Sequence, residues 1–303
     1  MKNFKILSFD GGGIKGALST RIILRLSHKY PNLLSDIDLF AGTSTGALIA
    51  LSLAYSKNAY TVDNLYNQYT SQKIFSKKRP NLFIPKYSHK NLVKELKNYF
   101  PEDLKLKNLD SYVFIPSFST TGFTSNFWEP VFFNNLTNNK TAEFSVIDTA
   151  LASSSAPTYF PSHKGFIDGG VVVNNPTPIA SFFALSKLES IKSSSELRIL
   201  SIGTGDYPNK ITSNTSKWGI FQWAFDPFRM IKSPILTILL EGSSLVEDIY
   251  CKELFMQNYY RLNPIISEHI EMDDYKKVNL LKNIADSIDL TDVYKYIENI
   301  FYR

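Results

Sequence analysis

Short hydrophobic runs alternate with longer amphipathic stretches in the N-terminal third of the chain. The run at 4–9 is apolar and ends at a glycine-rich segment, and 14–30 then places apolar residues at helical spacing. A second apolar run at 37–41 ends at Gly42, and the almost wholly apolar stretch 47–55 indicates a helix buried in the core. Two strand–loop–helix units in succession predict a parallel sheet of the α/β class.

The remaining chain continues this pattern less regularly. Further strands are predicted at 112–119, 131–133, 166–167, 197–202 and 258–262, and helices at 91–100, 144–154, 178–188, 235–254 and after Asp274. The segments 76–90 and 134–139 are expected to be loops. Because the chain shows no internal repeat and no linker, we expect one α/β domain over 1–262, with C-terminal helices in 263–303 packed on the same domain.

Composition narrows the choice of chemistry. Hydrophobic residues make up 44% and charged residues 20% of the 303 positions, as in a folded protein. The 33 Lys and Arg against 28 Asp and Glu give a net charge of +5, a mild excess that does not indicate a nucleic-acid polymer as partner. With Cys251 as the single cysteine and four scattered histidines, we expect no disulfide, no bound metal and no cofactor. Reactivity must then come from hydroxyls, carboxylates and backbone amides.

The apolar runs do not resemble export or membrane-spanning signals. The first run contains Lys5 and stops at Asp10, so it is not expected to act as a signal peptide. The most apolar later stretch, 235–240, is interrupted by Glu241, and no apolar run reaches the length of about 18 residues that a transmembrane helix needs. We therefore expect a cytoplasmic protein without a transmembrane helix.

The segment Gly42–Gly46 (GTSTG) joins an apolar run to the buried helix. Gly-x-Ser-x-Gly in this setting is typical of a nucleophile elbow, where small residues allow a sharp turn that exposes the serine. The following helix directs its N-terminal amides and dipole at the same point, which favours developing negative charge. Ser44 is therefore a candidate nucleophile; the alternative is a tight turn with an unreactive serine.

A glycine loop at 10–16 (DGGGIKG) also lies between a strand and a helix. Gly11, Gly12 and Gly13 let the backbone approach a bound group with its N–H groups turned inward. The loop matches neither the Walker pattern nor the dinucleotide-binding pattern, so it is interpreted as an oxyanion hole, a phosphate cradle or a plain turn. Because loops after neighbouring parallel strands converge on one sheet edge, we expect it to lie beside Ser44.

A serine nucleophile needs a base. Asp168 ends a predicted strand, and the following Gly169 and Gly170 permit a tight turn that leaves the carboxylate at the sheet edge. A lone carboxylate is a weak base unless partial desolvation raises its pKa. His163, the best placed of the histidines, leaves a Ser-His-Asp arrangement open, and a structural Asp-Gly turn is the non-catalytic alternative.

The three segments 10–16, 42–46 and 168–170, in this order, resemble the patatin-like phospholipases, which are lipid acyl hydrolases with a Ser–Asp dyad. Further matching segments are ASSSAPTYFP at 152–161, NNP at 174–176 and ILSIGTG at 199–205. The resemblance runs from about residue 4 to 262. It implies a single three-layer patatin-like catalytic domain with a mostly parallel central sheet and a helical, aromatic-rich cap.

The resemblance also implies the chemistry. Ser44 would be the nucleophile and Asp168 the base. The backbone amides of Gly11, Gly12 and Gly13 would form the oxyanion hole, Gly42, Gly46, Gly169 and Gly170 would support the turns, and Lys15 stands where the family carries Arg or Lys. Family members cleave fatty-acyl esters of phospholipids or galactolipids without calcium, so the implied partners are an acyl-lipid substrate and a peripheral membrane surface.

Other interpretations stay open on these residues. A sugar kinase of the actin-like fold also carries an Asp-Gly-Gly-Gly loop, but it would need neither Ser44 nor Asp168, and a non-catalytic lipid-binding module would tolerate the loss of either. Some relatives are exported effectors and others are membrane-degrading enzymes switched on by a nucleotide signal; the composition does not choose between these settings or identify an activating ligand or protein.

A cluster of large aromatic residues is expected to rest on lipid or to pack inward as the cap. Its members are Trp218, Phe221, Trp223, Phe225 and Phe228, close to Arg229 and Lys232.

Overall fold

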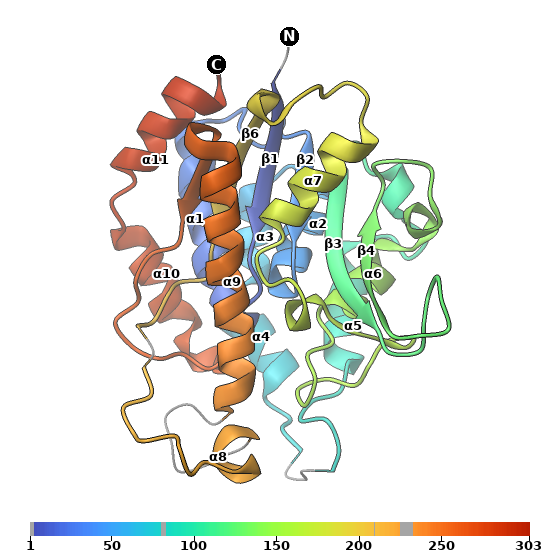
Figure 1. Cartoon of the computed structure of the whole chain (residues 1–303), viewed down its shortest axis with the longest axis vertical. Coiled ribbons are helices and arrows are strands. Elements are labelled where there is room, and N and C mark those ends of the chain that lie inside the picture. The colour runs from blue at the N-terminus through green and yellow to red at the C-terminus, as the bar shows by residue number, and fades with distance from the viewer. Residues whose placement is uncertain (1–2, 80–82, 209, 225–232) are drawn as a thin grey trace.

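The computed structural model describes residues 3–79, 83–208, 210–224 and 233–303, and one sheet lies at its centre (Figure 1). Its strands are β1 (Phe4–Phe9), β2 (Leu39–Gly42), β3 (Tyr112–Ser119), β4 (Glu129–Asn134), β5 (Phe166–Asp168), β6 (Leu197–Ile202) and β7 (Tyr259–Leu262). Their order is β4-β3-β2-β1-β6-β7, with β5 also paired to β3. All pairs are parallel except β3 with β4 and β3 with β5. The mostly parallel sheet of the α/β class is thereby confirmed.

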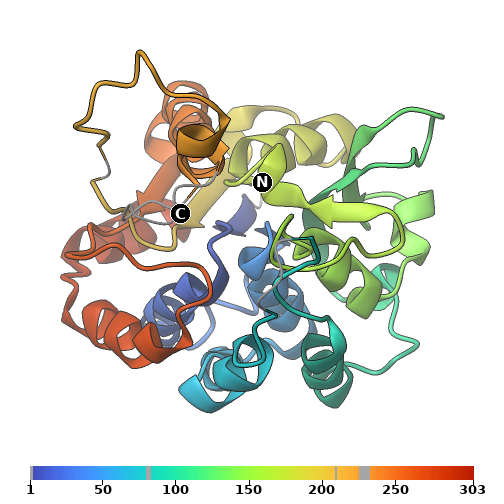
Figure 2. The same ribbon diagram turned by 90° about the horizontal axis from the view of Figure 1, so that it is seen from below.

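Helices cover both faces of this sheet. They are α1 (Gly16–Lys29), α2 (Thr45–Ser56), α3 (Ala59–Leu65), α4 (Gln68–Phe75), α5 (Lys90–Tyr99), α6 (Val146–Ser153), α7 (Thr177–Lys187), α8 (Ile220–Ala224), α9 (Pro234–Phe255), α10 (Val278–Ser287) and α11 (Thr291–Tyr296). In Figures 1 and 2, α7 and α9 lie on one face and α1, α2 and α10 on the other. Along β1, Leu7 and Phe9 enter the core beneath α1 and α2, whereas Ile6 enters the core beneath α7. The three-layer arrangement follows from this alternation.

Two helices occupy a stretch for which the hydrophobic pattern predicts no element. Asn58 caps α3 and Asn67 caps α4: their side-chain oxygens accept hydrogen bonds from the backbone N–H of Thr61 at 3.1 Å and of Thr70 at 2.8 Å. Side-chain caps of this kind satisfy amide donors that a short helix leaves free. Polar residues thus begin both helices.

The C-terminal helices share a core with the sheet. Val278, Leu281 and Ala285 of α10 are buried in the cluster that contains Ile22 of α1. The domain boundary at 262 stays a prediction.

The expected aromatic cap falls partly outside the described residues, because Phe225, Phe228, Arg229 and Lys232 lie there. Of the described members, Phe221 on α8 is 80% exposed. Trp218 and Trp223 are half-buried and contact each other edge to face, with ring centroids 5.0 Å apart. Within the described part of the chain, no helix has the length and apolar character needed to cross a membrane.

Candidate active site

Ser44 lies at the sharp turn from β2 into α2. Its backbone has φ 55° and ψ −118°, a conformation that residues other than glycine seldom adopt. The flanking glycines make this turn sterically feasible: a Cβ on Gly42 would lie 2.0 Å from the carbonyl oxygen of Gly46, and one on Gly46 would lie 2.2 Å from that of Phe9. The backbone N–H of Ser44 donates to the hydroxyl of Ser153 at 3.0 Å. This is the geometry that a nucleophile elbow requires.

Asp168 meets Ser44 directly. The Ser44 hydroxyl donates to Oδ2 of Asp168 at 2.6 Å, and Oδ1 of Asp168 accepts from the backbone N–H of Gly170 at 2.7 Å. Topology explains the meeting: β2 pairs with the first half of β3, and β5 pairs with the second half in the opposite direction. The Asp168 end of β5 is therefore brought to the carboxyl end of β2.

Burial changes the acidity of this aspartate. Asp168 is 5% exposed, and burial raises its pKa from the ordinary 3.8 to about 6, while the hydrogen bonds from Ser44 and Gly170 oppose the shift. A carboxylate with this pKa is still mostly ionised at neutral pH, yet it binds a proton more strongly than an exposed aspartate does. The short distance from the Asp168 carboxylate to the Ser44 hydroxyl and its raised proton affinity are both properties expected of a general base.

The glycine loop lies between β1 and α1, next to the elbow. The N–H of Gly11 differs from the expectation, because it already donates to the carbonyl oxygen of Asn174 at 3.1 Å. Among the described residues, no group accepts a hydrogen bond from the N–H of Gly12 or Gly13. Those two amides are therefore the better candidates for stabilising an oxyanion.

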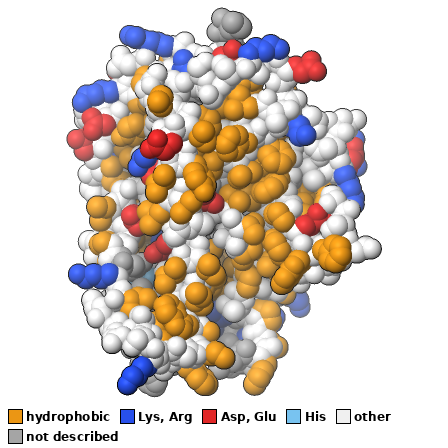
Figure 3. Space-filling model, in the orientation of Figure 1, with side chains coloured by type: hydrophobic (Ala, Val, Ile, Leu, Met, Phe, Trp, Pro, Cys, Tyr) orange, Lys and Arg blue, Asp and Glu red, His pale blue; other side chains and the backbone are white. Residues whose placement is uncertain are grey.

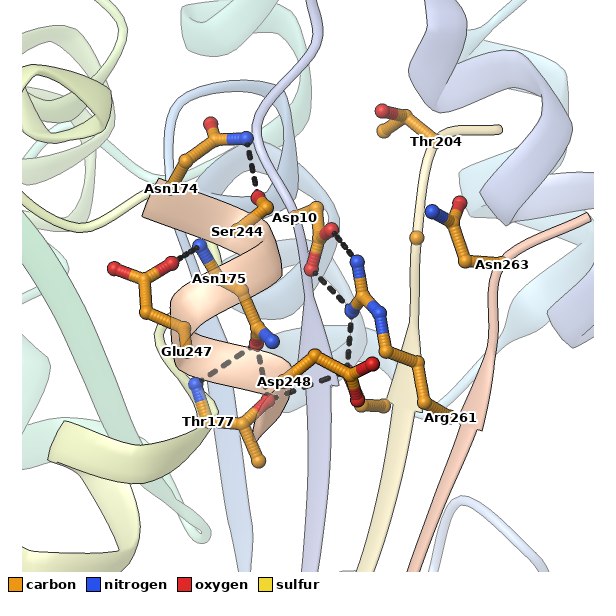
Figure 4. Close-up of polar contacts among 12 residues, drawn as sticks. Asp10, Asn174, Asn175, Thr177, Thr204, Ser244, Glu247, Asp248, Arg261 and Asn263 are labelled. Carbon is orange, nitrogen blue, oxygen red and sulfur yellow. Dashed lines mark hydrogen bonds and ion pairs between the residues drawn. The ribbon is translucent and has the colours of Figure 1, made fainter. Parts of the chain in front are cut away.

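A buried ion pair anchors the start of this loop (Figure 4). The two terminal nitrogens of the Arg261 guanidinium, on β7, donate to the Asp10 carboxylate, with Nη2 at 2.5 Å from Oδ2 and Nη1 at 3.1 Å from Oδ1. On the other side, the hydroxyl of Thr204 donates to the carbonyl oxygen of Gly11 at 3.1 Å. Bidentate pairing fixes position as well as charge, so the loop is held from β7 and from the segment that follows β6.

Lys15 follows the glycine loop and points to a groove rather than to the dyad. The groove, of about 1770 Å³, is lined by Gly11, Gly12 and Lys15 but not by Ser44. Burial lowers the pKa of Lys15, and the carboxylates of Glu241 and Asp206 oppose this change.

A second, apolar cavity has Ser44 in its wall. Its volume is about 120 Å³. Its hydrophobic lining includes Leu48, Ile74, Phe75, Leu92, Leu96, Phe100 and Phe160. Ser44 thus borders a space suited to a hydrocarbon chain, while Gly11 and Gly12 border a wider, more polar one.

The histidines do not contact the candidate nucleophile. His163 contacts Oδ1 of Asp148 through Nε2 at 2.8 Å, and Nε2 of His89 lies 3.3 Å from the hydroxyl of Ser155. Burial lowers the pKa of His89 to about 4. Among the described residues, the side chain that accepts a hydrogen bond from the Ser44 hydroxyl is therefore the carboxylate of Asp168 and not an imidazole.

Across residues 3–79, 83–208, 210–224 and 233–303, no group of three or more His, Cys, Asp and Glu side chains is arranged to hold a metal ion.

Sequence reasoning missed three residues that shape this site. They are Ser153, Asn174 and Arg261, which contact Ser44, Gly11 and Asp10. Ser153 and Asn174 lie in segments that match the family, and this was the signal available for them. The sequence held no such signal for Arg261, because Asp10, with which it forms an ion pair, lies 251 positions away.

Comparison with known proteins gives consistent matches. Residues 7–181 match the patatin-like phospholipase family, and this range contains the glycine loop, Ser44 and Asp168. Protein teg of Priestia megaterium is 29% identical over 98% of this chain and 99% of its own length. The putative sporulation hydrolase CotR of Bacillus subtilis is 29% identical over 98% of both chains. The cGAMP-activated phospholipase of Vibrio cholerae is 29% identical over 66% of this chain and 64% of its own. With more than half of its residues matched, the chain belongs to the patatin-like phospholipase family.

Proposed function

We propose that this protein is a calcium-independent lipid acyl hydrolase of the phospholipase A or lysophospholipase type, with Ser44 as nucleophile and Asp168 as base. The observation that carries the proposal is the 2.6 Å hydrogen bond from the Ser44 hydroxyl to Oδ2 of Asp168 at the strained elbow. Membership of the family supports a lipid substrate.

The reaction would proceed in two half-reactions. Asp168 accepts the hydroxyl proton as Oγ of Ser44 attacks the acyl carbonyl carbon, and the amides of Gly12 and Gly13 stabilise the oxyanion. The tetrahedral intermediate then releases the alcohol portion of the lipid, which takes the proton from Asp168, and leaves the acyl group on Ser44. Water attacks this ester with Asp168 again as base, so that the free fatty acid leaves and Ser44 is restored.

The two spaces that border the glycine loop would each take one part of the substrate, with Gly11 and Gly12 lining the groove and Gly13 and Ser44 lining the cavity. The apolar cavity bordered by Ser44 would take the start of the acyl chain, and the larger groove would take the headgroup side. This division agrees with an ester that joins a hydrocarbon chain to a polar group.

The end of the molecule that carries the catalytic turns would face the membrane. Phe83 is 96% exposed and Phe221 is 80% exposed, and both line the large groove together with Lys78 and Arg79. Aromatic residues beside cations suit the headgroup level of an anionic bilayer. Figure 3 shows further hydrophobic side chains along α9. Those in the first turns of this helix, which lie at the end of the molecule with the catalytic turns, are Ile235, Ile238 and Leu239.

The test uses phospholipid vesicles and measures released fatty acid by mass spectrometry. Wild type should release fatty acid with and without excess chelator, whereas Ser44→Ala and Asp168→Asn should lose several orders of magnitude in rate. Asp148→Asn, a substitution of the same kind outside the dyad, should retain activity. A calcium requirement, or more than a few per cent of activity in either dyad variant, would overturn the mechanism.

The alternatives give different results in the same assay. A non-catalytic lipid-binding module would bind vesicles without releasing fatty acid, and a Ser-His-Asp esterase would lose activity when His163 is replaced by Gln. The cGAMP activation in the name of the Vibrio cholerae relative describes that protein, and only the hydrolytic reaction is extended to this chain.

A further inference from the structure

Helix α9 contacts the turn that follows Asp168. Ser244 and Glu247 lie three residues apart on α9 and so on one face of the helix. The side-chain N–H of Asn174 donates to the hydroxyl of Ser244 at 2.9 Å, and the backbone N–H of Asn175 donates to Oε2 of Glu247 at 2.7 Å (Figure 4). Two successive residues of the turn are thus held by one helix face.

The same turn reaches both halves of the candidate site. The carbonyl oxygen of Asn174 accepts the N–H of Gly11 at 3.1 Å, next to the two amides assigned to the oxyanion hole. One residue earlier, the carbonyl oxygen of Val173 accepts from the hydroxyl of Thr43 at 2.9 Å, directly before Ser44. A displacement of the turn would therefore move the glycine loop and the elbow relative to each other.

We propose that α9 clamps the catalytic loops, with Ser244 and Glu247 as positioning residues that hold the Asn174–Asn175 turn. The inference rests on the proposed function, since it gives these side chains a task in that reaction. They touch neither Ser44 nor Asp168, and they act through the turn on the glycine loop.

The Glu247 side chain holds the turn as an uncharged hydrogen-bond acceptor rather than as a charged carboxylate in an ion pair. It is 8% exposed, and the Asp10 carboxylate and the Arg261 guanidinium are the charged groups that act on it most. Burial raises the pKa of Glu247 to about 8, so that the side chain is mostly uncharged at neutral pH. Glutamine therefore preserves its shape, its charge state and one acceptor oxygen, which makes Glu247→Gln a conservative variant.

The predicted effects follow from precise placement of the reacting groups. Glu247→Ala leaves the N–H of Asn175 without its acceptor, and Ser244→Ala frees the side chain of Asn174. Each should lower kcat about tenfold to hundredfold with little change in KM, because small displacements of catalytic groups cost rate rather than binding. Glu247→Gln should restore kcat to within about threefold of wild type.

Two residues of α9 serve as matched controls. Glu253 is exposed, and the hydroxyl of Ser243 donates to the carbonyl oxygen of Leu240 within its own helix. Glu253→Ala and Ser243→Ala remove the same groups from α9 without touching the turn, so both should behave as wild type.

The experiment combines ester kinetics with amide hydrogen exchange on the full-length protein. Hydrolysis of p-nitrophenyl butyrate gives kcat and KM for wild type, the three clamp variants and both controls, and reaction with an excess of a fluorophosphonate gives the fraction of folded active sites. Mass-spectrometric exchange is followed in peptides covering residues 9–16 and 169–176. We expect faster exchange in both peptides for Glu247→Ala and Ser244→Ala, and normal exchange for Glu247→Gln and the controls.

The two readouts separate failure of the clamp from failure of the proposed function. If kcat per active site and exchange are unchanged in Glu247→Ala and Ser244→Ala, the clamp is refuted while the hydrolase stands. If wild type does not hydrolyse the ester, the proposed function fails, and exchange alone decides whether α9 holds the turn.

Discussion

Replacing Asp168 with Asn should remove activity and at the same time stabilise the fold. The wild-type carboxylate is buried, with a pKa of about 6 in place of 3.8. Since a tenfold change in proton affinity corresponds to about 1.4 kcal/mol, keeping this carboxylate charged at neutral pH costs the folded protein about 3 kcal/mol. Asparagine removes the charge, and it can accept from the N–H of Gly170 and donate to the Ser44 hydroxyl.

The pH dependence fixes the sign of this effect. Because the pKa of Asp168 is higher in the folded than in the unfolded chain, wild type has its full stability below about pH 4 and loses part of it as the pH rises through about 6. Asp168→Asn does not titrate. The variant should therefore be more stable by up to about 3 kcal/mol near pH 7.5, and the advantage should disappear near pH 4.

The assay is urea unfolding followed by circular dichroism at both pH values. Asp148→Asn is the matched control, because the hydrogen bonds from His163 and Lys164 hold the pKa of Asp148 below its ordinary value. That variant should be less stable than wild type at neutral pH. If Asp168→Asn is also less stable there, or if its advantage does not depend on pH, the assignment of Asp168 as a buried base with a raised pKa is refuted.

Three further predictions concern the reaction itself. The kcat/KM for a soluble ester should fall about tenfold between about pH 7 and pH 5 as Asp168 is protonated, and a flat profile over this range would contradict its role as base. Gly46→Ala places a Cβ 2.2 Å from the carbonyl oxygen of Phe9, so both the melting temperature and ester hydrolysis should drop; normal values of both would show that the elbow tolerates a side chain. Leu96→Trp narrows the apolar cavity beside Ser44 and should lower the rate for long-chain relative to short-chain esters; an unchanged ratio would place the acyl chain elsewhere.

Local sequence was sufficient where neighbouring residues determine the structure. The elbow at Ser44 and the turn at Asp168 depend on adjacent glycines, so the sequence was enough to predict both turns. The short hydrophobic runs that alternate with amphipathic stretches likewise predicted the strands and helices around the sheet. The helices α3 and α4 could have been found from Asn58 and Asn67, whose capping bonds reach only three residues ahead.

Contacts between distant segments were not predictable in this way. Three consecutive glycines indicate an anion site, but only the fold shows that Asn174 takes the amide of Gly11 and leaves those of Gly12 and Gly13. Likewise, Glu247 appears in the sequence as one acidic residue on a long helix. Its burial against the N–H of Asn175 depends on how α9 packs over the sheet.

Covalent labelling tests the central claim most directly, because a fluorophosphonate reacts irreversibly with an activated serine. After labelling, peptide mapping by mass spectrometry locates the adduct, and the second-order rate constant is compared among wild type, Ser44→Ala and Asp168→Asn. The account predicts one adduct on Ser44 in wild type, none in Ser44→Ala, and labelling of Asp168→Asn slower by at least about a hundredfold. An adduct on another serine, or wild-type labelling in Asp168→Asn, would contradict a Ser44–Asp168 dyad.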